Sequence, residues 1–266
     1  RRVMALEAAL GIELFEKRPQ GYRLTAAGEA LLPAARRLAE AADAFADAAG
    51  AQGRVAGGSV RVTTIEVFAL SIMVPILREL HEAHPAIRIE MDTAGAVRDL
   101  GEGAAEVAIR VASQLPENAG LVGRRIGQAL WTVYCSRSYA EAHGSPRGSH
   151  GLAGHAFIGG GEPAIQAIYG EWLRANGLEG AVTMEHGSSA GLLAAVRGGL
   201  GLAVLPCIVA DQDPELIRCL RPTSHGRDIW LLTHERVRNS APVRAVMDFL
   251  APRLTALARH SRDLDG

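Results

Sequence analysis

The first 24 residues combine a helical pattern with two short stretches that alternate with a period of two. Val3, Leu6 and Leu10 recur at helical spacing, and Gly11 follows where a helix would end. Residues 13–17 and 22–24 then alternate like strands around a Pro- and Gly-containing turn. A helix followed by a small hairpin is typical of the second half of a winged helix-turn-helix. A plain surface hairpin has the same pattern, so both interpretations stay open at this point.

Residues 25–49 are predicted to form one long helix, with Thr25 as its N-cap. Leu31, Leu38 and Phe45 repeat every seven positions, and an alanine follows three positions after each of them. Such a seam of large and small residues lets two helices pack closely, so it predicts a dimerisation helix. The alternative is an alanine-rich helix that only covers the next domain. The glycine-rich residues 50–58 are predicted to end the helix and form a linker.

From residue 59 onward, short β-rich runs alternate with amphipathic helices, which is the pattern of an α/β fold. There are more runs than one five-stranded sheet requires, so we predict two lobes. The first takes about residues 59–130 plus 220–255, and the second takes about residues 136–215. A helix over residues 68–83 is expected to turn its apolar face inward, with buried positions at Leu70, Val74, Leu77 and Leu80.

Composition narrows the function classes. The 266 residues include 28 Lys and Arg against 29 Asp and Glu, so bulk charge does not indicate a nucleic-acid partner. No apolar stretch reaches the about 20 residues of a membrane span, and we predict no membrane partner. Three cysteines without CxxC spacing favour a reducing cytoplasm.

Sites of chemistry are few. The glycine groups at residues 159–161 and 199–201 lack the remaining residues of phosphate or dinucleotide motifs, so both are interpreted as tight turns. We predict no catalytic site, no cofactor and no metal. Cys207 and Cys219 are twelve positions apart and could form a redox pair, or could be small buried apolar residues.

Hydroxyl and glycine residues at predicted strand ends indicate a ligand site between the lobes. Helix-start amides, hydroxyls and the positive end of a helix suit a carboxylate. Glu66 would argue instead for a cationic or hydroxylated ligand if it points into the cleft. The hydroxyls could equally serve only as helix caps. The candidate effector-binding residues are Thr63, Thr64, Glu66, Thr93, Ala94, Gly187, Ser188 and Ser189.

Several segments together resemble the LysR-type transcriptional regulators. The sequence LEAALGIELFEKR at residues 6–18 is the most specific, and LTAAGE follows at residues 24–29. The segments that fit further along the chain are residues 106–110, 195–206 and 243–250. The resemblance covers essentially the whole chain in the expected order.

This resemblance implies a partial winged helix-turn-helix over residues 1–24, a long linker and dimerisation helix with a hinge over 25–55, and an effector domain over 56–266. The effector domain would be a two-lobed α/β fold like that of periplasmic binding proteins. Implied partners are promoter DNA, a small-molecule effector and further copies of the chain, as a homodimer or homotetramer in the cytoplasm. The residues expected to contact DNA are Arg1, Arg2, Lys17, Arg18 and Arg23.

Two departures from the family pattern accompany the resemblance. The chain begins inside a helical pattern, which predicts that the first helices of the DNA-binding domain are absent and that this chain dimerises and binds effector but binds DNA poorly. Glu106 stands where the family commonly has Asp. The alternative function is a solute-binding transport protein with the same two-lobed fold, although such a protein has no use for a heptad helix or a basic hairpin.

Overall fold

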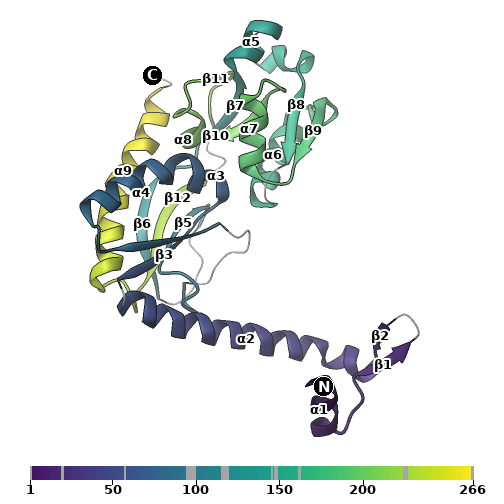
Figure 1. The fold of residues 1–266 in the computed structure, drawn as a ribbon. Helices are drawn as coiled ribbons and strands as arrows, with labels where there is room; N and C mark the ends of the chain where they lie inside the picture. The colour runs from purple at the N-terminus through teal and green to yellow at the C-terminus, as the bar shows by residue number, and fades with distance from the viewer. Residues whose placement is uncertain are drawn as a thin grey trace.

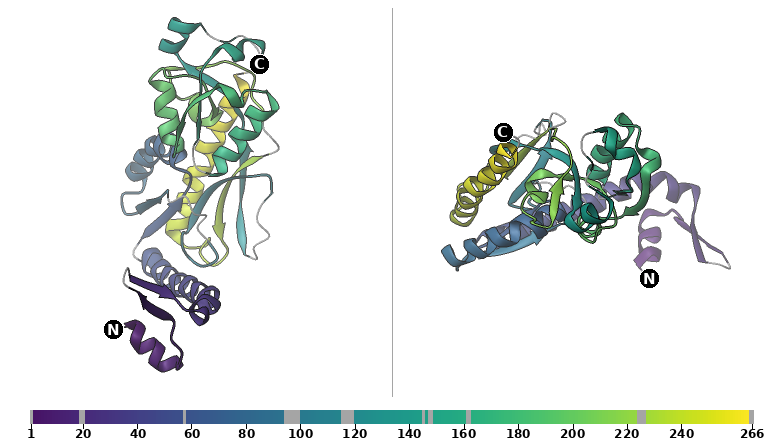
Figure 2. Two further views of the ribbon diagram at one scale, coloured as in Figure 1. Left: turned by 90° about the vertical axis from the view of Figure 1, so that its right-hand side faces the viewer. Right: turned by 90° about the horizontal axis from the view of Figure 1, so that it is seen from above.

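The computed structural model describes residues 2–18, 21–56, 58–93, 100–114, 120–144, 146, 149–160, 163–223 and 227–264. One long helix carries a helix and a hairpin at its far end and leads at its other end into a body of two α/β lobes (Figure 1). The two further views in Figure 2 keep the same arrangement. Across the described ranges, no helix is both long and apolar enough to cross a membrane.

The N-terminal unit is held together by one carboxylate. Helix α1 (Arg2–Leu10) is followed by β1 (Phe15–Arg18) and β2 (Gly21–Leu24), which pair antiparallel. A side-chain oxygen of Glu7 accepts hydrogen bonds from the backbone N–H groups of Leu14 and Phe15, at 2.8 and 3.0 Å. The wing-like hairpin is therefore tied to the end of α1, as the sequence pattern predicts.

Helix α2 (Ala26–Ala56) begins where the sequence predicts but runs further. The hydroxyl of Thr25 accepts a hydrogen bond from the N–H of Gly28 at 3.0 Å, so the predicted cap is confirmed. The predicted linker at residues 50–58 is wrong for residues 50–56, which are helical. A glycine costs only about 1 kcal/mol relative to alanine inside a helix. The helix therefore continues until it meets β3, which follows it in the chain and contacts it.

The first lobe is built on a five-stranded sheet in the order β4-β3-β5-β12-β6. Strands β3, β4 and β5 run parallel, whereas β12 is antiparallel to both β5 and β6. The bounds are β3 Ser59–Thr63, β4 Arg88–Asp92, β5 Val107–Ala112, β6 Leu121–Gln128 and β12 Asp228–His234. Strand β6 was not predicted from the sequence, because glycines and arginines interrupt its apolar residues.

A continuous helical segment covers one face of this sheet and contradicts part of the expected burial. It consists of α3 (Glu66–Phe68), the π-helical η1 (Ala69–Met73) and α4 (Val74–Ala83). Leu70 and Val74 are each 57% exposed, so the prediction that they point inward is wrong. A π turn holds more residues than an α turn, which rotates the apolar face relative to regular helical spacing. The residues that pack inward there are Ile72, Met73, Ile76 and Leu80.

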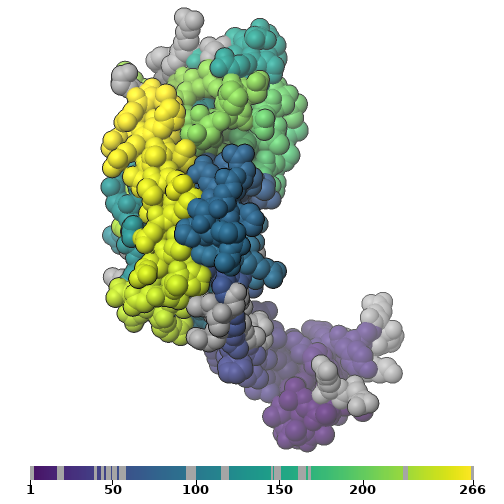
Figure 3. Space-filling view, turned by 60° about the vertical axis from the view of Figure 1, so that its left-hand side comes forward, coloured from purple at the N-terminus to yellow at the C-terminus, as the bar shows by residue number. Residues whose placement is uncertain are grey.

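Helix α9 (Ala241–Asp263) lies beside α4 on the outer surface of the first lobe, as Figure 3 shows. Its apolar face packs into the core that the sheet shares with α4. Its C-terminal half reaches the second lobe, where it contacts α8 (Cys207–Ala210). One helix therefore spans both lobes.

The second lobe has two small sheets, β10-β7-β11 and β8-β9. A parallel bridge between Phe157 and Leu202 joins them edge to edge. The strands are β7 Trp131–Ser136, β8 Phe157–Gly160, β9 Val182–His186, β10 Ala203–Pro206 and β11 Leu216–Arg218. The helices are α5 Arg137–His143, η2 Ser149–Gly154, α6 Pro163–Ala175, η3 Glu179–Ala181 and α7 Ser189–Arg197.

The chain crosses between the lobes at residues 129–130 and again after β11. The two crossings run side by side, because Trp131 and Thr223 each donate a backbone hydrogen bond of 2.9 Å to the other. Beside them, the buried Asp211 carboxylate accepts a 2.7 Å hydrogen bond from Tyr134 and bonds of 2.8 and 2.6 Å from Arg218. Arg218 also donates to the carbonyl of Ser261 in α9. This polar network fixes the second lobe against the helix that spans both.

Candidate functional site

The carboxyl ends of three first-lobe strands bring together Thr63, Asp92 and Arg110. The Arg110 guanidinium donates to the carbonyl and to the hydroxyl of Thr63, at 3.1 and 3.2 Å. Burial lowers the pKa of Arg110, and the nearby Asp92 carboxylate opposes that shift. An arginine keeps its charge even so. A half-buried cation therefore lies at the end of β3. The sequence pattern did not single out this residue, Arg110.

Thr64 follows directly and is only 3% exposed. Its backbone N–H donates to the carbonyl of Asp92 at 3.2 Å, but its hydroxyl has no hydrogen-bond partner among the described residues. The N-cap of α3 is Ile65 rather than a threonine, so Thr64 does not serve as a helix cap. A buried hydroxyl without a partner costs about 1–3 kcal/mol. Such an unsatisfied group marks a candidate ligand contact.

Across the seam, the second lobe presents the N-terminus of α7. Ser188 is its N-cap, and its hydroxyl oxygen accepts from the N–H of Gly191 at 3.1 Å. That bond leaves the hydroxyl hydrogen for donation to another group. The strand end at His186 lies against the same turn, since a Cβ at Gly191 would be 2.7 Å from its Nδ1 atom. His186 is a second residue that the sequence pattern missed.

The glycines after β8 act as a tight turn. Gly160 has a φ of +101°, and a Cβ there would overlap the backbone of His186. A glycine is required at this position for conformational and for steric reasons. The turn interpretation therefore holds for Gly160, while Gly161 lies outside the described residues.

The two sets of residues lie close to one seam. Ile65, at the start of α3, and Leu193, in α7, each pack against the apolar cores of both lobes, and α3 contacts α7. A hollow of about 420 Å³ opens along this seam between η1 and α7, with Ser71, Ala190 and Arg197 in its lining. Helices α3 and α7, which follow these two sets of residues in the chain, are therefore in contact across the boundary of the lobes, while the candidate residues themselves do not line this hollow.

Comparison with known proteins identifies the family. Residues 53–255 match the model of the LysR substrate binding domain. The chain belongs to the LysR family. It is 26% identical over 248 residues to the HTH-type transcriptional regulator CrgA of Neisseria meningitidis serogroup C (strain 8013), covering 92% of this chain and 79% of that protein. It is 24% identical over 269 residues to the probable HTH-type transcriptional regulator LtrA of Klebsiella pneumoniae, covering 97% and 85%.

Solved structures show the same fold. CrgA from Neisseria meningitidis aligns with a TM-score of 0.60 at 22% identity, over 95% of this chain and 87% of that chain. The full-length Vibrio cholerae virulence activator AphB aligns with a TM-score of 0.53 at 22% identity, over 94% and 87%. The regulator interpretation is thus confirmed over the solute-transport alternative, and the two-lobed fold with a preceding helix-turn-helix portion is confirmed as well.

The remaining effector candidates of this LysR-type regulator are placed less centrally. Thr93 and Gly187 are exposed, and Glu66 is half-buried in the first turn of α3. Ser189 is buried behind Ser188 at the start of α7. Ala94 lies outside the described residues. Within the described part of the chain, no group of His, Cys, Asp and Glu could hold a metal ion.

The candidate DNA and dimer residues lie away from this seam. Arg23 is exposed on β2, opposite Glu16. The other four DNA candidates are Arg1, which lies outside the described residues, and Arg2, Lys17 and Arg18, whose side chains the structure does not describe. On α2, the heptad residues Leu31, Leu38 and Phe45 are 39%, 73% and 77% exposed in the single chain.

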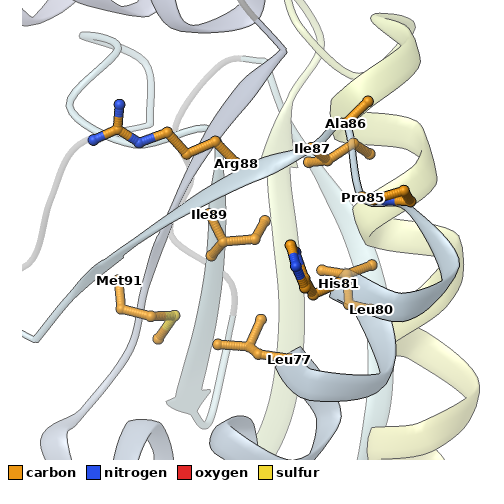
Figure 4. Close-up of a pocket in the computed structure, with 9 residues that line it drawn as sticks. All are labelled: Leu77, Leu80, His81, Pro85, Ala86, Ile87, Arg88, Ile89 and Met91. Atoms are coloured by element: carbon orange, nitrogen blue, oxygen red, sulfur yellow. The ribbon is translucent and has the colours of Figure 1, made fainter.

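A separate groove of about 430 Å³ lies at the outer edge of the first lobe (Figure 4). Leu77 and His81 of α4 form one wall, and Ile87 and Ile89 of the edge strand β4 and the turn before it form the other. It carries one cationic side chain, Arg88, which Figure 4 shows extending away from α4. Because it opens on the edge strand, it is distinct from the seam between the lobes.

The contrast between the two threonines gives a first prediction. Thr63→Val should lower the free energy of unfolding by about 1–2 kcal/mol, because it removes the hydroxyl that accepts from Arg110. Thr64→Val is the matched control and should leave stability unchanged or raise it slightly, because its hydroxyl is buried without a partner. Urea unfolding followed by tryptophan fluorescence measures both. An equally large loss for Thr64→Val would show that its hydroxyl has a structural partner.

Proposed function

We propose that this LysR-type regulator binds a small carboxylate between its lobes and that this effector controls its binding to promoter DNA. One observation carries the proposal. The Arg110 cation, bonded to Thr63, and the buried hydroxyl of Thr64, which has no partner among the described residues, lie at the same strand ends. A guanidinium has a planar fork of donors that matches the two oxygens of a carboxylate. Ligands in open α/β sheets bind beyond the carboxyl ends of the strands, which is where these residues lie.

The second lobe supplies a complementary positive end. The N-terminus of α7, capped by Ser188, points its backbone N–H groups toward the region before the helix. Helix N-termini favour anions because of their unpaired N–H groups and their dipole. Asp92 and Glu66 add negative charge to the first lobe, which favours an effector that carries hydroxyl groups beside its carboxylate. The proposed contacts are Thr63, Thr64, Arg110, Ser188 and Ser189.

Binding between the lobes provides the link to regulation. A ligand that contacts both lobes favours the arrangement in which its two sets of contacts form at once. The paired crossings at Trp131 and Thr223 are the segments about which the lobes would reorient. No residue is assigned a catalytic role in this proposal. The proposed location is the cytoplasm, which contains the promoter DNA.

The effector site is tested by calorimetry after a screen. At least one of the hydroxycarboxylates lactate, malate and mandelate should raise the Tm of the protein, because a ligand of the native state stabilises it. For that ligand, Thr64→Val should weaken binding by about 0.5–3 kcal/mol, the range for a lost hydrogen bond. Thr255→Val, in α9 where it lines a separate hollow beside β6, is the control and should bind normally.

Two results would contradict this site. A carboxylate that binds the Thr64→Val protein with unchanged affinity would place the effector elsewhere. The absence of any stabilisation by the three carboxylates would contradict the proposed chemistry of the effector.

LysR-type regulators oligomerise, and we propose that α2 supplies the contact in this protein. Leu38 and Phe45 are large apolar residues that the single chain leaves more than two-thirds exposed. Their spacing of seven is that of a coiled-coil seam, with small alanines between them. Pairing two copies of α2 along this seam would bury these side chains. Whether two or four copies assemble depends on further surfaces.

The heptad pattern of α2 predicts the outcome of a charge substitution. Leu38→Glu should dissociate the α2 pair, because a buried unpaired carboxylate is costly. Arg36→Glu, two positions earlier and off the seam, is the matched control and should leave the assembly intact. Sedimentation velocity of both variants measures the change. An unchanged sedimentation coefficient for Leu38→Glu would show that other contacts hold the oligomer.

The hairpin is proposed to contact DNA phosphates through its basic residues, including Lys17, Arg18 and Arg23. Arg23 is exposed on β2, so its side chain is accessible to a phosphate. Arg23→Ala should reduce the slope of log K against log salt by about one for binding to duplex DNA of any sequence. Arg244→Ala, exposed at the start of α9, is the control. Fluorescence anisotropy over a salt series measures the slope, and an unaltered slope for Arg23→Ala would exclude this contact.

A further inference from the structure

Two of the three cysteines lie against each other at the root of the second lobe. The Sγ atoms of Cys135 and Cys219 are 3.5 Å apart, with the Cys219 thiol donating to the Cys135 sulfur. The pairing suggested by sequence spacing, Cys207 with Cys219, is therefore not the closest one. Cys207 instead begins α8, where it interacts with the hydroxyl of Tyr134. Strand pairing, which sequence distance does not reveal, determines which thiols meet.

The backbone around this pair comes from two neighbouring strands. Ile217 of β11 stands opposite Cys135 of β7, and the N–H of Cys219 donates to the carbonyl of Val133 at 2.9 Å. The cysteines are therefore diagonal neighbours on one face of the sheet. Strand β11 ends at Arg218, so Cys219 belongs to the irregular segment that leads back to the first lobe.

We propose that Cys135 and Cys219 are an oxidisable thiol pair that a hydroperoxide converts to an intramolecular disulfide. The sulfurs must approach by about 1.5 Å to reach the length of an S–S bond. Cys219 can supply this movement because it lies beyond the end of its strand. The product joins β7 to the segment that leads from β11 back to the first lobe, four residues along the chain from each member of the Trp131–Thr223 pair.

The chemistry follows from the exposure of each thiol. Cys135 is fully buried, whereas Cys219 is partly exposed, so the oxidant reaches Cys219. The Cys219 thiolate attacks the terminal oxygen of the hydroperoxide, the O–O bond breaks, and a sulfenic acid forms at Cys219 while an alcohol or water leaves. Cys135 then attacks that sulfur, the S–O bond breaks, and the hydroxyl leaves as water with the Cys135 proton. Two thiols lose two electrons, which reduce one peroxide.

The environment of Cys135 suits the second step. The hydrogen bond that it accepts from Cys219 lowers the pKa of the Cys135 thiol, although burial opposes this shift. The attacking sulfur is already in contact with its target, so the step requires no movement of either lobe. Cys207 is buried and interacts with the hydroxyl of Tyr134 instead.

The disulfide would restrict the hinge. It closes a loop between positions 84 apart in the sequence, which contains nearly the whole second lobe. It also fixes the start of the second crossing, residues 219–223, against β7. Oxidation is therefore expected to slow opening of the hydrogen bonds that the N–H groups of Cys219 and Thr223 make with β7.

Hydrogen peroxide is the probe for this proposal. The reduced protein, denatured and treated with iodoacetamide, should accept an alkyl group at each of its three cysteines. After treatment with peroxide, the protein should accept only one alkyl group. Before alkylation its mass should be lower than that of the reduced protein by two hydrogens. A peptide that links Cys135 to Cys219 should appear after digestion. Dithiothreitol should restore the full alkylation. Hydrogen exchange at residues 219–223 should be slower in the oxidised protein.

Variants sharpen the assignment. Cys207→Ala should still lose two alkylation sites, whereas Cys219→Ala should lose none through an intramolecular disulfide. Peptide mapping of the wild-type protein decides the pairing even if a variant fails to fold. A disulfide that includes Cys207, full alkylation after peroxide, or oxidation of Cys219 without a disulfide would each overturn the pair. Unchanged exchange at residues 219–223 would overturn the proposed effect on the hinge.

Discussion

The antiparallel pairing of the two crossings between the lobes is the constraint on which the rest of this structure depends. Reciprocal backbone bonds between Trp131 and Thr223 fix the register of the crossings. Because the register is fixed, the end of β3 and the start of α7 meet across one seam. The β7–β11 ladder is a separate pairing, offset by two residues from the Trp131–Thr223 pair. It sets Ile217 opposite Cys135 and so brings Cys219 beside Cys135, while Arg218 reaches Asp211 between the second lobe and α9. The pairing of the crossings and this ladder together hold the thiol pair and the polar network at the root of the second lobe.

The buried polar groups of the hinge and of the seam between the lobes differ in how completely they are hydrogen-bonded. Asp211 is buried but accepts bonds from Tyr134 and Arg218, so its charge is compensated. At the seam, Arg110 is compensated by Thr63, yet the hydroxyl of Thr64 is buried without a partner among the described residues. Native proteins rarely leave such groups unsatisfied, so each one calls for an explanation. The Thr64 hydroxyl is one of several such groups among the described residues, and it is set apart by its place next to the Arg110 cation at the strand ends.

Strand β3 joins the functional parts of this LysR-type regulator. Its first residues contact the end of α2, and its last residue, Thr63, accepts hydrogen bonds from Arg110. Only seven residues, 57–63, lie between the last residue of the linker helix and Thr64 at the proposed effector seam. The strand lies between β4 and β5 in the sheet and is almost fully buried, so it connects the two as a stiff element. The long helix and the ligand-binding lobes are thus mechanically continuous.

The sequence by itself determined the order of the parts, because local periodicity and caps act over a few residues. Thr25 capped α2, the heptad marked its exposed face, and the alternation of strands and helices predicted two α/β lobes. Thr63, Thr64 and Ser188 were candidates because hydroxyls at strand ends are visible in a sequence, and their role in binding stays a prediction. Their surroundings were not visible. Arg110 and His186 joined the site only through contacts with residues distant in the chain.

Tertiary contacts decided the remaining features. Helix α2 continues through Gly50 and Gly53, where its end meets β3, although local propensity favours a stop. The π turn of η1 turned Leu70 and Val74 outward against the regular helical period. Strand pairing placed Cys219 next to Cys135 rather than Cys207. In each case the deciding interaction joins residues from different elements, and a pattern read along one element carries no information about it.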